Sequence, residues 1–276
     1  MRLRLFFLFS VLFFLSIPSA AQTPTLPPPE RDAQAVSLLR GALAAMTAAA
    51  SVTGGQSTAV TDVTLNGTVR RVAGSLDESG TATLKGTAAG ASLTEFDLPS
   101  GTLEESRDLT AATPAGTWEE SSGAPHPVAF HNLATDPTWF YPALLIERAL
   151  STASYGILYA GAATRNGVAA NDIRIYSYLL ISPTSVAGLN QTLGQMDLYL
   201  DATTSLPLAL DFDTHLDKNA LVNLPVEVRY LSYAKQGVAM VPSEIRKYID
   251  DSLSLDIQVS SAQLDTGLTS ASLSLQ

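Results

Sequence analysis

The sequence predicts a mainly β fold of the α+β class, in which a curved antiparallel sheet forms an unclosed β-barrel and helices cover its concave face. The clearest observation is the alternation near the C-terminus, where polar residues separate Leu253, Leu255, Ile257 and Val259. Strands of this kind have one wet face, whereas parallel strands buried on both sides show continuous apolar runs. Helical patterns are few, so they can cover only one side of the sheet.

The N-terminal segment has the order of a secretory signal peptide, which we assign to residues 1–21. Arginines precede an apolar run from Leu5 to Ile17, and the small residues of "PSAAQ" follow it. A membrane anchor is the alternative, but the run is shorter than the roughly 20 apolar residues that span a bilayer. We therefore expect export across the inner membrane, to the periplasm, with no transmembrane segment after signal removal.

A proline-rich stretch, "QTPTLPPPE", follows the predicted signal at residues 22–30 and predicts an extended linker. No second linker interrupts residues 31–276. All-β sheets and barrels of this length often form one domain, so we expect a single half-barrel domain there.

The composition excludes several classes of function. The chain has no cysteine, which rules out disulfides, thiolate metal sites and a lipid-modified N-terminal cysteine. Its 16 basic and 26 acidic residues give a formal net charge of -10, which argues against nucleic acid as a partner and against electrostatic docking to anionic lipid. Any contact with lipid must therefore be apolar.

Three helices are expected. The first follows the linker, and its apolar stripe is formed by Val36, Leu39, Leu43 and Met46. For the second, Asp136 is the expected N-cap and Pro137 the first helical residue, and Pro142 either kinks this helix or begins another. The third is expected after Ser182, with Pro183 in its first turn.

Hairpins fill the rest of the chain. Pro99-Ser100-Gly101 indicates a turn between two short strands, and Asn166-Gly167 is a favoured tight-turn dipeptide between two longer ones. The C-terminal third is almost entirely hairpin and predicts an antiparallel meander.

The stretch "LYLDATTSLPLALDF" supplies most of the candidate ligand-binding residues, because its bulky apolar residues keep to even positions on both sides of a turn. The candidates for a cavity wall are Leu198, Leu200, Leu206, Leu208, Leu210 and Phe212. The aspartates at odd positions, Asp197, Asp201, Asp211 and Asp213, are read as the wet face, since the chain lacks a calcium-loop motif.

The apolar stretch "TWFYPALL" predicts part of a helical lid over the cavity, with Trp139, Phe140 and Leu144 as further candidate residues. Adjacent residues of a regular helix point in different directions, so Trp139, Phe140 and Tyr141 cannot all face the core from one helix. Some of that surface is therefore expected to meet a mobile or external apolar partner, with simple loop packing as the alternative.

These elements in this order resemble the envelope lipoprotein-localisation factors, the LolA/LolB-like superfamily. In that group a strand reading hydrophobic–Asp–x–x–Thr–x–Leu–Pro precedes a return strand, and Asp201, Thr204, Leu206 and Pro207 match it. The "V-x-M-V-P-x-x-I" piece from Val238 to Ile245 resembles another recurrent element. The resemblance implies an unclosed barrel, a helical lid and a cavity for acyl chains.

The chain departs from that group in two respects. The group's carrier uses an arginine inside the cavity to tie down the lid; Arg70 and Arg71 lie in a predicted strand, but no motif assigns that role to either. The group's outer-membrane receptor is a lipoprotein, which a chain without cysteine cannot be. A general lipid-binding role is therefore the safer implication.

No catalytic motif is found: there is no G-x-S-x-G, H-E-x-x-H, P-loop or G-x-G-x-x-G sequence. His126, His131 and Asp136 are spaced by five residues, too loosely for a helical metal site, and a turn with a hydrogen-bonding His131 is the favoured interpretation. His215, in "DTHLDKN", is expected in an exposed loop. We therefore expect no enzyme activity, no metal and no cofactor.

Two functional hypotheses remain. The first is a non-enzymatic periplasmic or envelope protein that binds or carries an acyl chain, lipid or lipoprotein in an apolar cavity, with another envelope protein as a possible partner. The alternative is a structural or protein-interaction module of the cell envelope whose core is filled by its own side chains. An unrecognised hydrolase is a third and weaker option.

Overall fold

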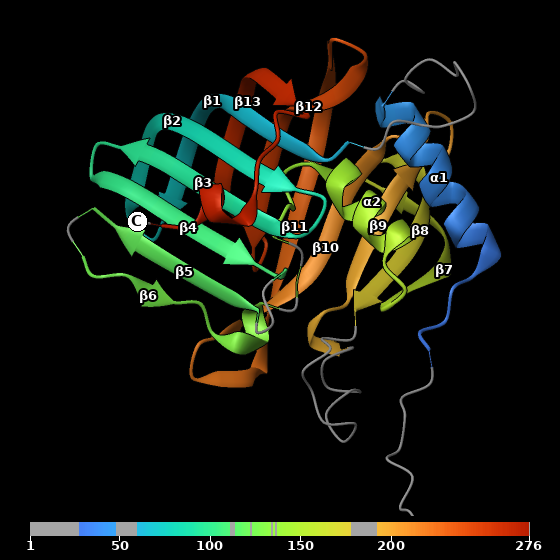
Figure 1. The fold of residues 1–276 in the computed structure, drawn as a ribbon, viewed down its shortest axis with the longest axis horizontal. Helices are drawn as coiled ribbons and strands as arrows, with labels where there is room; N and C mark the ends of the chain where they lie inside the picture. Colours follow the sequence, from blue (N-terminus) through green and yellow to red (C-terminus); the bar gives the residue numbers. More distant parts are fainter. Residues whose placement is uncertain are drawn as a thin grey trace, which may run out of the picture.

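A computed structural model describes residues 28–47, 60–110, 114–121, 123–133, 135, 137–177 and 192–275. Its main feature is one antiparallel sheet of 13 strands, in the order β6-β5-β4-β3-β2-β1-β13-β12-β11-β10-β9-β8-β7 (Figure 1). Strands β6 and β7 are the two edges and do not pair with each other, so the barrel is unclosed. The predicted fold class is confirmed.

Consecutive strands are antiparallel neighbours from β1 to β6 and again from β7 to β13, and the first and last strands pair at the centre of the sheet. They are β1 (Asp62–Ala73), β2 (Leu76–Thr87), β3 (Ala91–Leu98), β4 (Gly101–Asp108), β5 (Ala115–Glu120), β6 (His126–Pro127), β7 (Tyr155–Arg165), β8 (Val168–Ser177), β9 (Met196–Asp201), β10 (Pro207–Leu216), β11 (Asn219–Gln236), β12 (Ala239–Ile249) and β13 (Ser252–Leu264).

Both predicted turns are confirmed. Strand β3 ends at Leu98 and β4 begins at Gly101, whose positive φ of 129° favours glycine. The β7–β8 turn consists of Asn166 and Gly167, with φ values of 52° and 80°, the left-handed pair that a tight hairpin requires.

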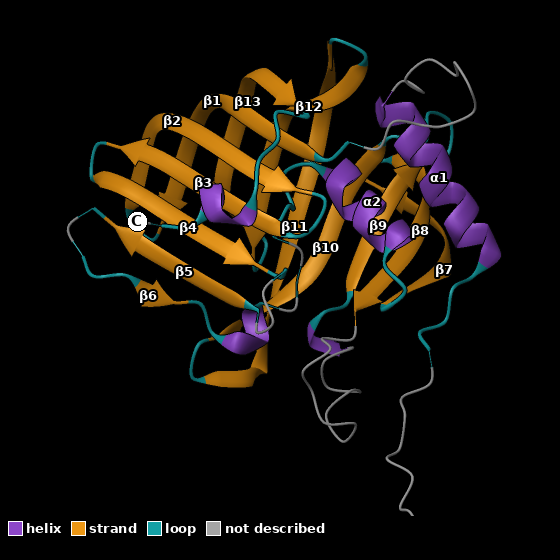
Figure 2. Cartoon of the chain, viewed as in Figure 1, coloured by secondary structure: helices purple, strands orange, loops and turns teal. Residues whose placement is uncertain are grey.

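Two α-helices, α1 (Ala33–Thr47) and α2 (Pro142–Ser151), pack against each other over the β7 side of the sheet (Figure 2). Helix α1 also contacts β12. Leu39, Leu43 and Met46 of its predicted stripe are buried, and Val36 is half-buried against the same core. None of the helices within the described ranges is long and apolar enough to cross a membrane.

The chain crosses from one free edge of the sheet to the other between β6 and β7. This crossing contains the short 3-10 helix η1 (Phe130–Asn132), a covering loop that we define as the described residues 133, 135 and 137–141, and α2. Because β6 and β7 are the sheet edges, the part of the chain that covers the concave face also bridges the gap that the barrel leaves open.

The second helix begins later than the sequence predicted. Residues 137–140 form turns, Tyr141 is the N-cap, and Pro142 occupies the first turn of α2. The prediction of a helix from Pro137 was therefore wrong, and the alternative in which Pro142 begins a helix was right. A proline fits the first turn because its missing N–H has no partner there in any case.

Three predictions lie wholly or largely outside the described residues: the signal peptide, the linker up to residue 27, and the helix expected after Ser182. The proposed N-cap Asp136 lies outside them as well.

Candidate functional site

The concave face of the sheet is buried by α1, α2 and the covering loop. Trp139, Phe140 and Tyr141 are 7%, 0% and 0% exposed, so all three face the core. In this conformation the structure shows simple loop packing, the alternative that the sequence left open, because the backbone here is not a regular helix. Turn backbone at residues 137–140 can direct successive side chains to the same side.

The covering loop is held to the sheet by a few polar contacts. The Tyr230 hydroxyl donates a hydrogen bond of 2.6 Å to the Trp139 carbonyl oxygen. The Lys247 ammonium lies 4.7 Å from the centre of the Trp139 ring, a cation–π contact. Beside the loop, Arg107 Nη1 donates to the carbonyl oxygen of Asn132 at 2.9 Å. Arg107 Nη1 also lies 3.5 Å from the Thr135 hydroxyl oxygen, and Trp139 and Phe140 add apolar packing against the core.

Charged side chains face the interior beside this loop. Lys247 of β12 is paired in register with Leu255 and Val228, which are buried, so it shares their concave face. Glu105 and Arg107 of β4 form an ion pair of 2.6 Å across the interior from Lys247. Strands β12 and β4 are not neighbours in the sheet, so their approach shows how tightly the sheet is rolled.

Burial strongly affects the pKa values of Lys247 and Glu105. Burial lowers the pKa of Lys247 to about 8, although the Glu105 carboxylate acts in the opposite direction. Burial also opposes ionisation of Glu105, but the positive charges of Arg107 and Lys247 outweigh it and lower the pKa of that carboxyl. The interior therefore holds one carboxylate beside two basic groups.

A second ion pair on the concave face shows which of the adjacent residues Arg70 and Arg71 faces inward. Arg71 faces inward and lies 3.4 Å from Glu78, whereas Arg70 faces outward and pairs with the exposed Asp77. Glu78 also accepts hydrogen bonds from Ser100. Neither arginine has a contact to the covering loop among those found in the described part of the chain, so neither matches the lid-tying arginine of the resembled group.

Three tyrosine hydroxyls belong to the same interior. Tyr230 and Tyr233 donate to the carbonyl oxygens of Trp139 and Pro207, and the hydroxyl of Tyr141 is buried with no hydrogen-bond partner among the described residues. Burial raises the pKa of each phenol, and the phenols of Tyr230 and Tyr141 raise that of Tyr233 further.

The structure brings together most of the candidates from the sequence. Those buried in the hydrophobic core are Leu198, Leu200, Leu210, Trp139, Phe140 and Leu144. Leu206 and Phe212 are half-buried against that core. Leu208 is half-buried but does not belong to it, because the pairing of β10 with β9 shifts between Pro207 and Ala209. Pro207 takes the position opposite Leu200 that the alternation had assigned to Leu208.

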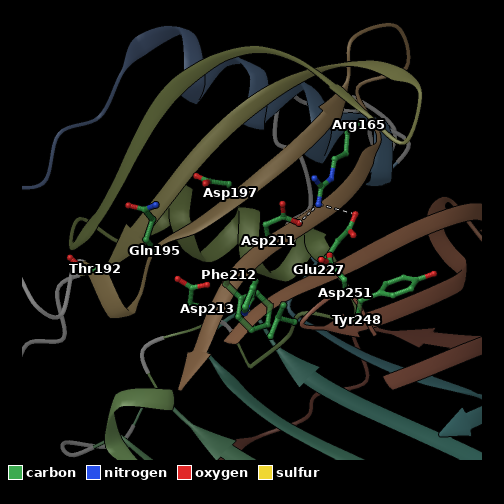
Figure 3. Close-up of a pocket in the computed structure, with 12 residues that line it drawn as sticks. Arg165, Thr192, Gln195, Asp197, Asp211, Phe212, Asp213, Glu227, Tyr248 and Asp251 are labelled. Atoms are coloured by element: carbon green, nitrogen blue, oxygen red, sulfur yellow. Dashed lines mark hydrogen bonds and ion pairs between the residues drawn. The ribbon is translucent and has the colours of Figure 1, made fainter. Parts of the chain in front are cut away.

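The outer face of the same strands carries a cavity of about 360 Å³ with a largely charged lining (Figure 3). Arg165, at the end of β7, reaches across it to Asp211 of β10 at 2.6 Å and Glu227 of β11 at 2.8 Å. The Arg165 guanidinium also lies 4.8 Å from the centre of the Tyr199 ring. The prediction that the aspartates of this hairpin face away from the core agrees with this arrangement.

Burial raises the pKa of Asp211 to about 7 even though Arg165 acts against it, because Glu227 and Asp197 add negative charge. Asp197 is directly opposite Asp211 in the pairing of β9 with β10. Within the described ranges, no three His, Asp or Glu side chains are placed to hold a metal ion. The polar lining makes this cavity unsuitable for an acyl chain.

His131 and His215 are in contact, which the sequence did not predict. His215 lies in β10 and is 6% exposed, so the expectation of an exposed loop was wrong. Its ring stands edge-on to that of His131, with 5.9 Å between the centres, and His131 Nε2 lies 3.1 Å from the Leu216 carbonyl oxygen. The prediction that His131 is a hydrogen-bonding turn residue is confirmed, and His126 stacks on Trp118.

No protein-family model and no curated protein sequence matches the chain. Among solved structures, it is similar to a DUF1329 family protein from Desulfovibrio piger, with a TM-score of 0.51 and 12% identity over 89% of this chain and 98% of that one. It is also similar to a domain assigned to outer membrane lipoprotein sorting from Vibrio parahaemolyticus, with a TM-score of 0.52 and 13% identity over 87% and 96%.

These likenesses define the class of fold. At such low identity they show a shared architecture, and the chain has the unclosed-barrel, LolA-like fold that its sequence resembles. The sequence-based recognition of this fold is confirmed.

Proposed function

We propose that this protein binds an acyl chain, as part of a lipid or lipoprotein, between the concave face of its sheet and the covering loop. In this proposal it acts as a non-enzymatic carrier in the bacterial periplasm or envelope. The fold shared with a domain assigned to lipoprotein sorting supports the proposal.

The observation that carries the proposal is how the concave face is covered. An apolar wall that includes Leu198, Leu200 and Leu210 is buried by a loop and two helices rather than by a second sheet. Tyr230 and Lys247 both hold this loop to the sheet through Trp139. Displacing it would uncover a long apolar surface, and each methylene of a ligand buried there contributes roughly 0.8 kcal/mol.

The alternative function is a structural or protein-interaction module of the envelope, and one observation favours it. Phe140, Tyr141 and Leu144 are 0% exposed, so the protein's own side chains occupy the space beneath the cover in this conformation. The two functions differ in whether the covering loop ever moves away from the concave face of the sheet.

Tryptophan fluorescence can separate them, because the chain has two tryptophans, Trp118 and Trp139. In a Trp118→Phe variant, Trp139 is the single reporter beneath the cover. We expect a phospholipid or fatty acid methyl ester brominated on its acyl chain to quench Trp139 in a saturable way. A protein purified without detergent that carries no lipid in native mass spectrometry, and whose Trp139 is not quenched, would favour the structural module.

An engineered disulfide, which can be formed and reduced, tests whether the covering loop must move for a ligand to bind. A Cβ atom at Gly86 would lie 2.8 Å from Thr138 Cγ2, an atom one bond away from the Thr138 Cβ, so cysteines at these two positions are close enough to test for a disulfide, whose Cβ atoms lie roughly 3.5–4.5 Å apart. We expect the oxidised Gly86→Cys, Thr138→Cys protein to exclude the brominated ligand and the reduced protein to bind it. The single variant Gly86→Cys is the control, because it adds the same side chain against the loop and cannot form the disulfide. Equal binding by both redox forms would contradict entry beneath this loop.

A further inference from the structure

The hydroxyl of Tyr141 has an unusual position. The residue is 0% exposed, lies in the hydrophobic core, and its hydroxyl oxygen has no hydrogen-bond partner among the described residues. Leaving a buried hydroxyl unpaired is unfavourable, and buried tyrosines ordinarily find a partner. The neighbouring Tyr230 and Tyr233 follow this rule by donating to carbonyl oxygens.

The backbone fixes where this hydroxyl lies. Tyr141 is the N-cap of α2, its N–H donates to the Thr138 carbonyl oxygen at 2.9 Å, and its own carbonyl oxygen accepts from Leu144 N at 3.1 Å. Residues on both sides, Phe140 and Leu144, are fully buried against the sheet. The phenol is therefore held in the interior at the junction of the covering loop and α2.

We infer that the Tyr141 hydroxyl donates a hydrogen bond to the carbonyl oxygen of an uncharged acyl ester or amide, and so selects lipids and lipoproteins over hydrocarbon chains and free fatty acids. This inference rests on the proposed function, since it assigns one atom of the ligand to one atom of the same interior. Tyr141 is then a binding residue with no catalytic role.

The electrostatics of the site specify an uncharged acceptor. Burial, together with the negative charge of Asp265, raises the pKa of Tyr141, so its phenol keeps its proton and remains a donor. The same two effects disfavour a carboxylate at this position, because it would lose its hydration and be repelled by Asp265. An ester or amide carbonyl accepts the bond without bringing a charge.

The inference is tested with Tyr141→Phe in the Trp118→Phe background. The probes are two brominated chains of equal length, a fatty acid methyl ester and an alkane, read by quenching of Trp139. We expect Tyr141→Phe to weaken binding of the ester by about 3-fold to 10-fold, the value of one hydrogen bond, and to leave the alkane unchanged. Its melting temperature should not fall, because no protein hydrogen bond is lost.

Tyr233→Phe is the matched control. Its hydroxyl donates to the Pro207 carbonyl oxygen at 2.8 Å, so this variant should lower the melting temperature without changing the ratio of ester to alkane binding. Equal ester binding by Tyr141→Phe and the parent, or equal weakening of ester and alkane, would overturn the inference. If the parent binds neither probe, the proposed function itself fails, which is a different result.

Discussion

Arg31 Nη1 lies 2.9 Å from the carbonyl oxygen of Ala149, so a residue that precedes α1 caps the C-terminal end of α2. The same guanidinium donates to the carbonyl oxygens of Leu150, Thr152 and Tyr155. The last carbonyls of a helix have no partner within it, and a cation there also interacts favourably with the helix dipole. One arginine thus fastens the covering helix to the N-terminal end of the fold.

Arg31→Met is therefore expected to lower the free energy of unfolding by about 2 kcal/mol, because carbonyl groups at the end of α2 lose their donors. Urea denaturation measures this. Arg40→Met is the matched control, since Arg40 is exposed on α1, and it should change stability by less than about 0.5 kcal/mol. Similar losses for both variants would show that capping by Arg31 is not the cause.

Gly86 is a point of close approach between the sheet and the covering loop. An added Cβ would lie 2.8 Å from Thr138 Cγ2 and 3.1 Å from Phe140 Cζ. We expect Gly86→Ala to destabilise the protein by about 1–3 kcal/mol through overpacking, and to increase the quenching of Trp139 by acrylamide as the loop is pushed outward. In Gly41→Ala the nearest atom is 3.9 Å away, and this helical variant should be neutral or slightly stabilising.

Asn132 forms hydrogen bonds with the backbone of His215, close to the turn of the β10–β11 hairpin. Its amide nitrogen donates to the His215 carbonyl oxygen at 2.8 Å, and its amide oxygen accepts from His215 N at 2.8 Å. Asn132→Ala is expected to cost about 1–3 kcal/mol, because buried backbone groups lose their partners, and to speed proteolysis between residues 213 and 225. Asn223→Ala, which removes an exposed hydrogen bond to Asp213, should do neither.

Asp211 predicts a pH dependence. Its pKa is raised from 3.8 to about 7, so between these values the folded state binds a proton that the unfolded state has released. This group therefore stabilises the fold at low pH, and its contribution is lost as pH rises, by up to about 1.4 kcal/mol per pH unit.

Asp211→Asn should remove that slope and raise stability at pH 8, because an asparagine oxygen can still accept from Arg165. Urea midpoints between pH 4 and 8 measure it, with the exposed Asp217→Asn as control. A parent protein whose stability rises with pH across this window, and an Asp211→Asn variant that follows it, would contradict the assignment.

The strands could be predicted from the sequence because alternation is a local property, as Leu253 to Val259 illustrate. Contacts between segments that are distant in the chain could not be predicted in this way. The burial of His215 requires Asn132 of η1 to pack on β10, and the approach of Lys247 to Glu105 requires the sheet to roll. Neither contact leaves a local pattern in the sequence.

The interior was predicted only in part for a related reason. A single bulge in β10 changes the position of Leu208, although Leu210 and Phe212 keep theirs. Pro137 and Pro142 both carry helix-start signals, and tertiary packing of the covering loop decided between them. Tyr141 carried no signal, because an unpaired hydroxyl becomes visible only when its surroundings are known.

The pairing of β1 with β13 has a consequence for the order in which the chain can fold. Leu65 lies opposite Ala262, so the centre of the sheet joins residues from the two ends of the chain. The strands from β1 to β6, and those from β7 to β13, can each assemble from neighbouring hairpins as they emerge. The two halves can join only when β13, the last strand, is present, and a contact between such distant residues forms slowly. Until then each half exposes an unpaired central strand, and at this stage aggregation competes most directly with folding.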